Sequence, residues 1–209
     1  MDSWAFDYSV AKIFDQHAKQ HIPHYESIIR KSVDVCNKLS RKDDPIIDVG
    51  CATGNTLNLL HHHGYTNVYG LDSSAAMLAQ CRDSASLIQS DKFSFSNNSF
   101  QGIICNWTLH FIQNKSAYLT DLVNSLRPNG FLIVTDKVSL DPLMIDLYYD
   151  FKHSQGVTRS EILAKEHSLQ NVMFINGPDW YQEKFTQLGL KYHVIDADYA
   201  FMTFLCIKQ

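Results

Sequence analysis

The first forty residues carry two apolar stripes with helical spacing. Val10, Ile13 and Phe14 share one face of the first segment, and a second stripe runs from Ile28 to Leu39. Amphipathic helices repeat their apolar residues at i, i+3, i+4 and i+7. We therefore expect two helices within residues 1–40, followed by a charged break at residues 41–45.

From residue 46 onward, short apolar runs alternate with helical segments. We expect strands at 46–49, 68–71, 87–88, 102–105 and 130–135, the last of them after a turn at 127–130. We expect the intervening helices at 55–63, from 73 or 74 to 81, and at 115–126. Strands joined by helical crossovers form parallel sheets with helices on both faces.

The last third of the chain has a different order of elements. Helices are expected at 142–151, 160–169 and 179–188, then an antiparallel strand pair at 192–196 and 201–207. The sequence thus predicts one α/β domain over residues 1–209, with a doubly wound, seven-stranded, mostly parallel sheet. Helices within 140–189 would form a lid over the carboxyl edge of that sheet, where ligands bind in such folds.

Composition and charge narrow the functional classes. With 209 residues, 45% of them hydrophobic and 19% charged, the chain suits one globular domain. A net charge of -4 gives no electrostatic footprint for nucleic acid, so direct nucleic-acid binding is not expected. A small-molecule substrate is expected instead. His61, His62 and His63 point in different directions on a helix, so no metal site is expected there.

The remaining compositional signals concern location. The five cysteines are odd in number and widely spaced, which favours reduced thiols in a cytoplasmic protein. Residues 1–4 do not begin a secretory signal, and no apolar run approaches the roughly 20 residues that span a bilayer. We therefore expect a cytoplasmic protein with no membrane partner.

A glycine-rich turn between the first strand and its helix is the main chemical signal. The loop Gly50-Cys51-Ala52-Thr53-Gly54 follows Asp48, and Asp72 ends the next strand about 20 residues later. A carboxylate at that place accepts hydrogen bonds from ribose hydroxyls. Each residue taken singly also fits a plain strand-to-helix turn, but their order together favours a nucleoside site.

Two cofactor classes use this layout. Nicotinamide sites favour G-x-G-x-x-G, in which the second glycine lets the backbone approach a pyrophosphate. Here Ala52 occupies that position, so a cofactor without a pyrophosphate is preferred. Asp48 can then orient the loop and the ammonium group of an amino-acid moiety.

These motifs are similar to those of Rossmann-like (class I) S-adenosylmethionine-dependent methyltransferases. The resemblance rests on residues 48–54, on Asp72 and on the segment 126–132. It implies a Rossmann-like fold with S-adenosylmethionine (SAM) as cofactor, loop residues 50–54 beneath the methionine moiety, Asp72 on the ribose and Asp91 near the adenine.

A narrower resemblance covers most of the chain. Residues 4–7, 23–25, 106–111, 150–152 and 169–173 are similar to motifs of bacterial carboxy-SAM synthases, which use prephenate and SAM and serve tRNA wobble-uridine modification. This resemblance also implies a possible homodimer. The ligand contacts that it implies are Tyr25, Gly50, Ala52, Asp72, Ser73, Asp91, Lys92 and Asn106.

One position departs from that family. Its lid helix carries an arginine that holds a carboxylate, and Glu166 stands at the matching position. A carboxylate cannot reproduce the two parallel hydrogen bonds of a guanidinium. If Glu166 faces the pocket it disfavours carboxylated ligands, whereas a sulfonium tolerates it. The alternatives are a solvated surface charge, or a rotated helix whose Lys165 or His167 restores anion binding.

His110 follows the fourth strand at the mouth of the expected pocket. It is a candidate general base, and a structural histidine is the competing interpretation. Our primary prediction is a SAM-dependent methyltransferase acting on a small molecule, with His110 and Glu166 on the substrate side. The alternatives are a carboxy-SAM synthase-like enzyme and a non-catalytic module that binds SAM or S-adenosylhomocysteine. Cys51 and Gly54 complete the expected cofactor loop.

Overall fold

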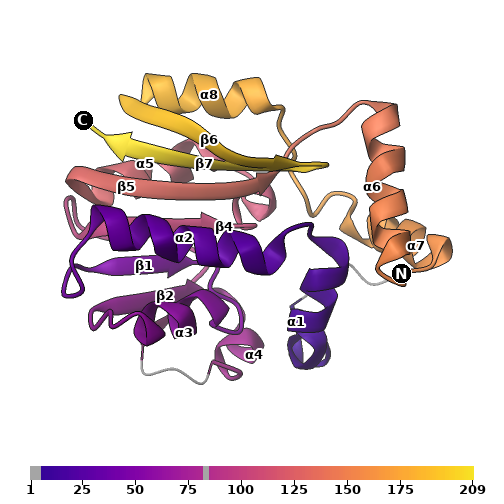
Figure 1. Ribbon diagram of the computed structural model, residues 1–209, viewed down its shortest axis with the longest axis horizontal. Helices are drawn as coiled ribbons and strands as arrows, with labels where there is room; N and C mark the ends of the chain where they lie inside the picture. Colours follow the sequence, from indigo (N-terminus) through magenta and orange to yellow (C-terminus); the bar gives the residue numbers. More distant parts are fainter. Residues whose placement is uncertain (1–5, 82–84) are drawn as a thin grey trace.

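A computed structural model describes residues 6–81 and 85–209, so Trp4 and Ala5 of the resemblance lie outside the described residues. Seven strands form one sheet in the order β3-β2-β1-β4-β5-β7-β6 (Figure 1). The strand bounds are β1 Ile46–Val49, β2 Val68–Asp72, β3 Ser86–Gln89, β4 Phe100–Asn106, β5 Leu126–Lys137, β6 Leu190–Asp198 and β7 Phe201–Lys208. The first five strands run parallel, and β7 pairs antiparallel with both β5 and β6. The predicted fold class is confirmed.

Helices cover both faces of the sheet and the carboxyl ends of its strands. Their bounds are α1 Tyr8–His21, α2 Tyr25–Leu39, α3 Asn55–His62, α4 Ala75–Leu78, α5 Lys115–Ser125, α6 Pro142–Ser154, α7 Arg159–Leu169 and α8 Pro178–Gln187, with a 3-10 turn, η1, at Leu109–Phe111. In Figure 1, α1, α6 and α7 lie beyond the carboxyl ends of β1, β4 and β5.

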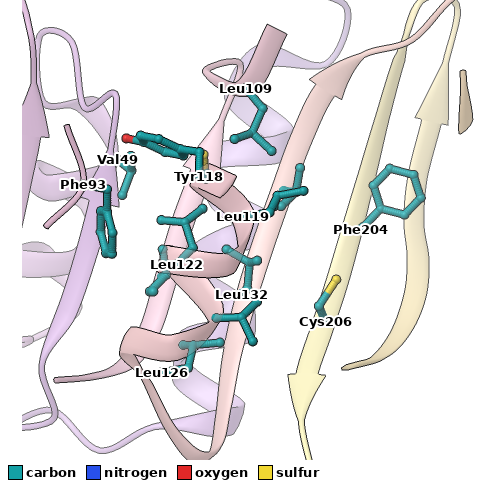
Figure 2. Close-up of a cluster of buried hydrophobic side chains, with 14 of the residues drawn as sticks. Val49, Phe93, Leu109, Tyr118, Leu119, Leu122, Leu126, Leu132, Phe204 and Cys206 are labelled. Carbon is teal, nitrogen blue, oxygen red and sulfur yellow. The ribbon is translucent and has the colours of Figure 1, made fainter. Parts of the chain in front are cut away.

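Apolar side chains hold these layers together. On one face, Val33 and Cys36 of α2 pack with Leu57 and Leu60 of α3 over the sheet. On the other face, a larger cluster joins the sheet to α5 and α8. Figure 2 shows part of that cluster, with Leu119 and Leu122 of α5 beside the sheet. β1 is buried along its whole length, which explains why three of its four residues, Ile46, Ile47 and Val49, are apolar.

The order of strands creates the ligand crevice. β1 is hydrogen-bonded to β2 on one side and to β4 on the other, so the chain leaves it in opposite directions along the sheet. Ligands of doubly wound sheets bind at such a reversal, beside the carboxyl ends of the strands. The glycine loop follows β1 and η1 follows β4, which brings both segments to this crevice.

Two predicted boundaries were wrong for local reasons. The turn expected at 127–130 lies inside β5, where the pairing shifts between Phe100–Leu126 and Gly102–Phe131 and Asn129 takes a φ of 61°. The helix expected to reach Cys81 ends at Leu78. The chain continues in tighter turns, with the Cys81 N–H donating to Leu78 O, and these turns place Cys81 Sγ 3.6 Å from Ala52 O.

Candidate functional site

A cavity of about 700 Å³ opens at the crevice between the sheet and the helices α1, α6 and α7. This volume is within the usual range for sites that bind small molecules. One end is lined by the glycine loop and by the ends of β1 and β2, and the other end by residues of α6 and α7. We call these the loop end and the lid end.

The loop end depends on an unusual backbone. Gly50 and Gly54 have φ values of 73° and 84°, and Ala52 also lies in the left-handed region at 46°. A Cβ atom on Gly50 would lie 2.0 Å from Thr108 Oγ1, which itself donates to Val49 O and Asn106 O. Glycine is therefore required at position 50 both by the positive φ angle and by the close approach of Thr108, the residue before η1.

Asp72 points toward the glycine loop. Its Oδ2 accepts the Ala52 N–H at 2.9 Å, and its Oδ1 accepts the Ser74 N–H at 2.8 Å. The carboxylate also borders the cavity, and burial raises its pKa above the ordinary range. Each oxygen keeps a second lone pair, so the group can still accept hydrogen bonds from a diol.

Asp48 lies beneath the loop and is almost fully buried. Burial raises its pKa to about 7, against the effect of a hydrogen bond from Thr56. The carboxyl therefore changes charge near neutral pH. An ammonium group in the neighbouring cavity would favour its ionised form.

The other predicted loop-end residues divide into two groups. Cys51, Ser73 and Asp91 border the cavity along with Asp48, Gly50, Ala52 and Asp72. Gly54 instead directly precedes α3, at its N-cap position, where a Cβ would lie 2.5 Å from Cys81 Sγ, so its role is in packing. Lys92 has an exposed side chain and does not belong to the cavity lining that the described residues form.

Two aromatic residues, Tyr25 and Trp107, also border the cavity. Tyr25 packs against Trp107 with 4.8 Å between ring centroids, and its hydroxyl accepts a hydrogen bond from Asn55 at 3.3 Å. Asn106 borders the cavity, but its amide group bonds Ser32 Oγ at 3.2 Å and Thr135 Oγ1 at 2.7 Å. Asn106 therefore positions β4 and α2 relative to each other.

The lid end collects three lysines around one carboxylate. Lys137, Lys152 and Lys165 all border the cavity together with Glu166, whose carboxylate accepts a hydrogen bond from Tyr149. Burial, followed by the charge of the neighbouring lysines, lowers the pKa of Lys165 to about 7 and that of Lys152 to about 8. Burial also lowers the pKa of Lys137.

Two histidines of α1 complete the lid end. His17 Nε2 lies 3.0 Å from Lys165 Nζ, and burial lowers the pKa of His17 to about 4. His21 is 8% exposed, and its Nδ1 makes no hydrogen bond within the described structure. Trp107 Nε1 is likewise buried without a partner in the part of the chain that the structure covers. Buried polar atoms of this kind usually have a ligand or water as partner.

His110 borders the cavity from the turn η1, which follows β4. It lies in η1, and its ring Nδ1 and its backbone N–H both contact Asp136 Oδ1, the latter at 3.1 Å. Asp136 is fully buried and also accepts the hydroxyl of Tyr181. Among the two predicted catalytic residues, His110 thus has a fixed ring, whereas Glu166 is an exposed helix residue tied to Tyr149.

Several residues of the lid end could not be predicted from the sequence. His17, His21, Lys137 and Lys152 come from three separate segments, and no spacing rule brings them together. One signal was present in the sequence: the polar residues Thr135, Asp136 and Lys137 directly follow the apolar run of β5. Polar residues at the carboxyl end of a parallel strand commonly belong to a site.

Comparison with known proteins agrees with this geometry. Residues 47–134 match the methyltransferase domain family. The carboxy-S-adenosyl-L-methionine synthase of Wolinella succinogenes is 35% identical over 186 residues, covering 80% of this chain and 78% of that protein. The protein of the same name from Nautilia profundicola is 28% identical over 222 residues, covering 97% and 94%.

Solved structures show the same fold at much lower identity. The magnesium protoporphyrin IX methyltransferase of Synechocystis, determined with bound S-adenosylhomocysteine, superposes with a TM-score of 0.68 at 13% identity and covers 97% of each chain. None of the helices in residues 6–81 and 85–209 has the length and apolar character needed to cross a membrane. This chain belongs to the carboxy-S-adenosyl-L-methionine synthase family of SAM-dependent methyltransferases, and SAM is its cofactor.

Proposed function

We propose that this protein transfers a methyl group from SAM to a small anionic acceptor bound at the lid end of the cavity. The convergence of Lys137, Lys152 and Lys165 carries this proposal. Besides burial, Lys137 lowers the pKa of Lys152, and both of these lysines lower the pKa of Lys165, because like charges in a partly desolvated site disfavour one another. An anion placed among them relieves that repulsion and gains charge-assisted hydrogen bonds.

The neighbouring lysines change what Glu166 can do at the lid end. If Glu166 faces the pocket, its position in the sequence predicts that it disfavours carboxylated ligands, but three lysines border the same cavity and outweigh a single negative charge. Its carboxylate is also engaged by Tyr149. We assign Glu166 to tuning the charge of the lid end, where it favours the protonated forms of Lys137 and Lys152.

Two buried nitrogen atoms without a partner in the described chain support the same acceptor class. The indole N–H of Trp107 and the Nδ1 atom of His21 are both buried, and neither has a hydrogen-bond partner within the described chain. Both residues border the cavity, and His21, whose pKa burial lowers, is close enough to all three lysines for their charge to lower that pKa further. An acceptor that carries oxygen atoms can satisfy these groups, whereas an apolar acceptor would leave them unpaired at a cost of about 1–3 kcal/mol each.

Calorimetry and product analysis test this function. We expect SAM to bind without an acceptor, and we expect a methylated product from anionic probes such as 4-hydroxybenzoate and not from their uncharged amides. Lys152→Met and Lys165→Met should raise the KM of the anionic probe at least about tenfold, the effect of one lost ion contact of roughly 1.4 kcal/mol. Their dissociation constant for SAM should stay unchanged.

Lys38→Met is the matched control, because Lys38 is an exposed lysine of α2. A preference for uncharged or cationic probes, or an unchanged KM in both cavity variants, would reject the anionic acceptor. SAM binding without turnover on any class of acceptor would instead favour a non-catalytic binding module.

A second candidate, carboxy-SAM synthase activity, is favoured by one specific observation. The three lysines offer positive charge to a carboxylate at the same end where the family's arginine is replaced by Glu166. Incubation with SAM and prephenate, followed by mass spectrometry, separates the two candidates. A cofactor product heavier by one carboxyl group would establish this activity, and a methylated acceptor would establish the first.

A further inference from the structure

We infer that His110 is the general base of the transfer, positioned by a buried chain of Asp136, Tyr181 and Lys115, and that the acceptor attacks through an atom that carries a proton. This inference deepens the proposed function and rests on it. It adds a requirement on the acceptor besides negative charge: a hydroxyl, amine or similarly protic nucleophile.

The contacts of the His110 ring fix its tautomer. Nδ1 hydrogen-bonds the Asp136 carboxylate, which accepts and cannot donate when ionised. The proton of a neutral His110 ring therefore lies on Nδ1, and the lone pair lies on Nε2. No described residue hydrogen-bonds Nε2, and the ring borders the cavity. The backbone is fixed as well, because His110 O accepts the Phe174 N–H at 2.7 Å.

Asp136 is itself held by two further elements. The Tyr181 hydroxyl of α8 donates to Asp136 Oδ2, and Lys115 Nζ of α5 donates to that hydroxyl at 3.3 Å. Lys115 Nζ also donates to Asn176 Oδ1 at 2.7 Å. The carboxylate thus accepts from the His110 ring, the His110 backbone and Tyr181 while fully buried.

Burying this series of hydrogen-bonded polar residues costs folding free energy, which suggests a use beyond packing. A buried charged group needs several well-placed partners merely to offset its desolvation, and an apolar replacement often gives equal or greater stability. Here the hydrogen-bonded series ends at the His110 ring, which borders the cofactor cavity. The same logic, a carboxylate that orients a histidine whose other nitrogen takes a proton, recurs in enzymes of unrelated folds.

The proposed step balances in atoms and electrons. When bound, SAM supplies a methyl group whose bond to sulfur breaks with both electrons left on sulfur. The nucleophilic atom of the acceptor forms the new bond to carbon, and its proton passes to His110 Nε2. Asp136 stabilises the resulting imidazolium through Nδ1–H. His110 then releases the proton to water that enters as the product leaves.

Long-range ¹H–¹⁵N correlation spectra test the tautomer without turnover. His110→Gln identifies the His110 signals by their loss, and His193→Gln, at an exposed position, is the matched control. In the protein with S-adenosylhomocysteine, we expect Nδ1 protonated and Nε2 unprotonated at pH 8. Asp136→Asn should abolish this preference. Tyr181→Phe removes only one hydroxyl and is the second variant in case Asp136→Asn fails to fold; it should weaken the preference. A proton on Nε2 in the wild type would overturn the inference.

Kinetics with the methyl acceptor supply the second test. His110→Gln should lower kcat about 10²–10⁴-fold, the usual range for general-base catalysis, and leave the dissociation constant of SAM unchanged. Unchanged turnover in His110→Gln would overturn the inference even if the proposed function stands. Failure to bind SAM would refute the proposed function instead, so the two failures are distinguishable.

Discussion

At the residue scale, Asp48 links the cofactor site to pH. Burial gives its carboxyl a pKa of about 7, well above the ordinary value near 3.9. A raised carboxyl pKa means that the folded protein binds more protons than the unfolded chain between roughly pH 4 and 7. Without ligand, Asp48 therefore lowers stability as the pH rises through this window.

We predict that the affinity for SAM increases between pH 6 and 8, because the ionised carboxylate of Asp48 attracts the ammonium of the methionine moiety. Asp48→Asn should remove most of this pH dependence and bind SAM about tenfold more weakly at pH 7.5, the equivalent of roughly 1.4 kcal/mol. The same variant should melt at a higher temperature at pH 8 in the absence of SAM. Calorimetry and thermal melts measure both effects.

Asp34→Asn, at an exposed position of α2, is the control for this experiment. If Asp48→Asn keeps the pH dependence of the wild type, Asp48 does not contact the ammonium. If it binds SAM weakly but also melts at a lower temperature, its effect is a general loss of structure.

At the element scale, the turn between β1 and α3 determines whether the loop end forms. Two glycines allow a clean comparison, because Gly50 and Gly64 have similar φ values of 73° and 85°. A Cβ on Gly50 meets Thr108 Oγ1 at 2.0 Å, whereas a Cβ on Gly64 has no atom within 4 Å.

We predict that Gly64→Ala lowers the free energy of unfolding by about 1–2 kcal/mol through backbone strain alone. Gly50→Ala should cost more than this, and it should also weaken SAM binding because Thr108 and the loop must move apart. Denaturant unfolding and calorimetry measure these quantities. Equal losses of stability in the two variants, with SAM binding retained, would show that Thr108 moves aside without consequence.

Strands and helices with a clear apolar pattern and glycine boundaries could be predicted from the sequence. The strands β1, β2 and β4 and the helix α3 follow from apolar runs and glycine boundaries, and Asp72 was placed at the loop by its position after β2. The bulge at Asn129 could not be predicted, because a turn signal inside a long strand has the same residues as a turn between elements.

The lid end was beyond prediction for a different reason. Lys137, Lys152 and Lys165 lie in β5, α6 and α7, and only the docking of α6 and α7 onto the carboxyl edge brings them together. Glu166 departs from a family pattern at a single position, whereas the charge of the lid end depends on three lysines that are far apart in the sequence. The role of Asp136 was likewise invisible until α8 placed Tyr181 beside it.

At the scale of the whole molecule, the lid lysines set binding against stability. Burial, followed by repulsion from neighbouring lysines, holds the pKa values of Lys165 and Lys152 at about 7 and 8, below the ordinary value near 10.4. Above pH 7 the unfolded chain therefore binds more protons than the folded protein, and the free energy of unfolding should rise with pH until the ordinary lysine pKa is reached. Below pH 7 the full penalty of the buried charges is present.

We predict that Lys165→Met raises the melting temperature by about 2–6 °C at pH 6 and by much less at pH 9.5, where the folded wild type already holds a neutral amine. Stabilisation by the anionic acceptor should also be greater at low pH, because the acceptor binds the charged lysines. It should raise the melting temperature of the wild type more at pH 6.5 than at pH 9, and it should hardly affect Lys165→Met. A lysine kept for packing alone would lose stability on replacement at every pH, and the acceptor would not distinguish the two proteins. A variant that is more stable than the wild type at pH 6, but that the acceptor no longer stabilises, therefore separates a binding site from a structural cluster with one pair of thermal melts.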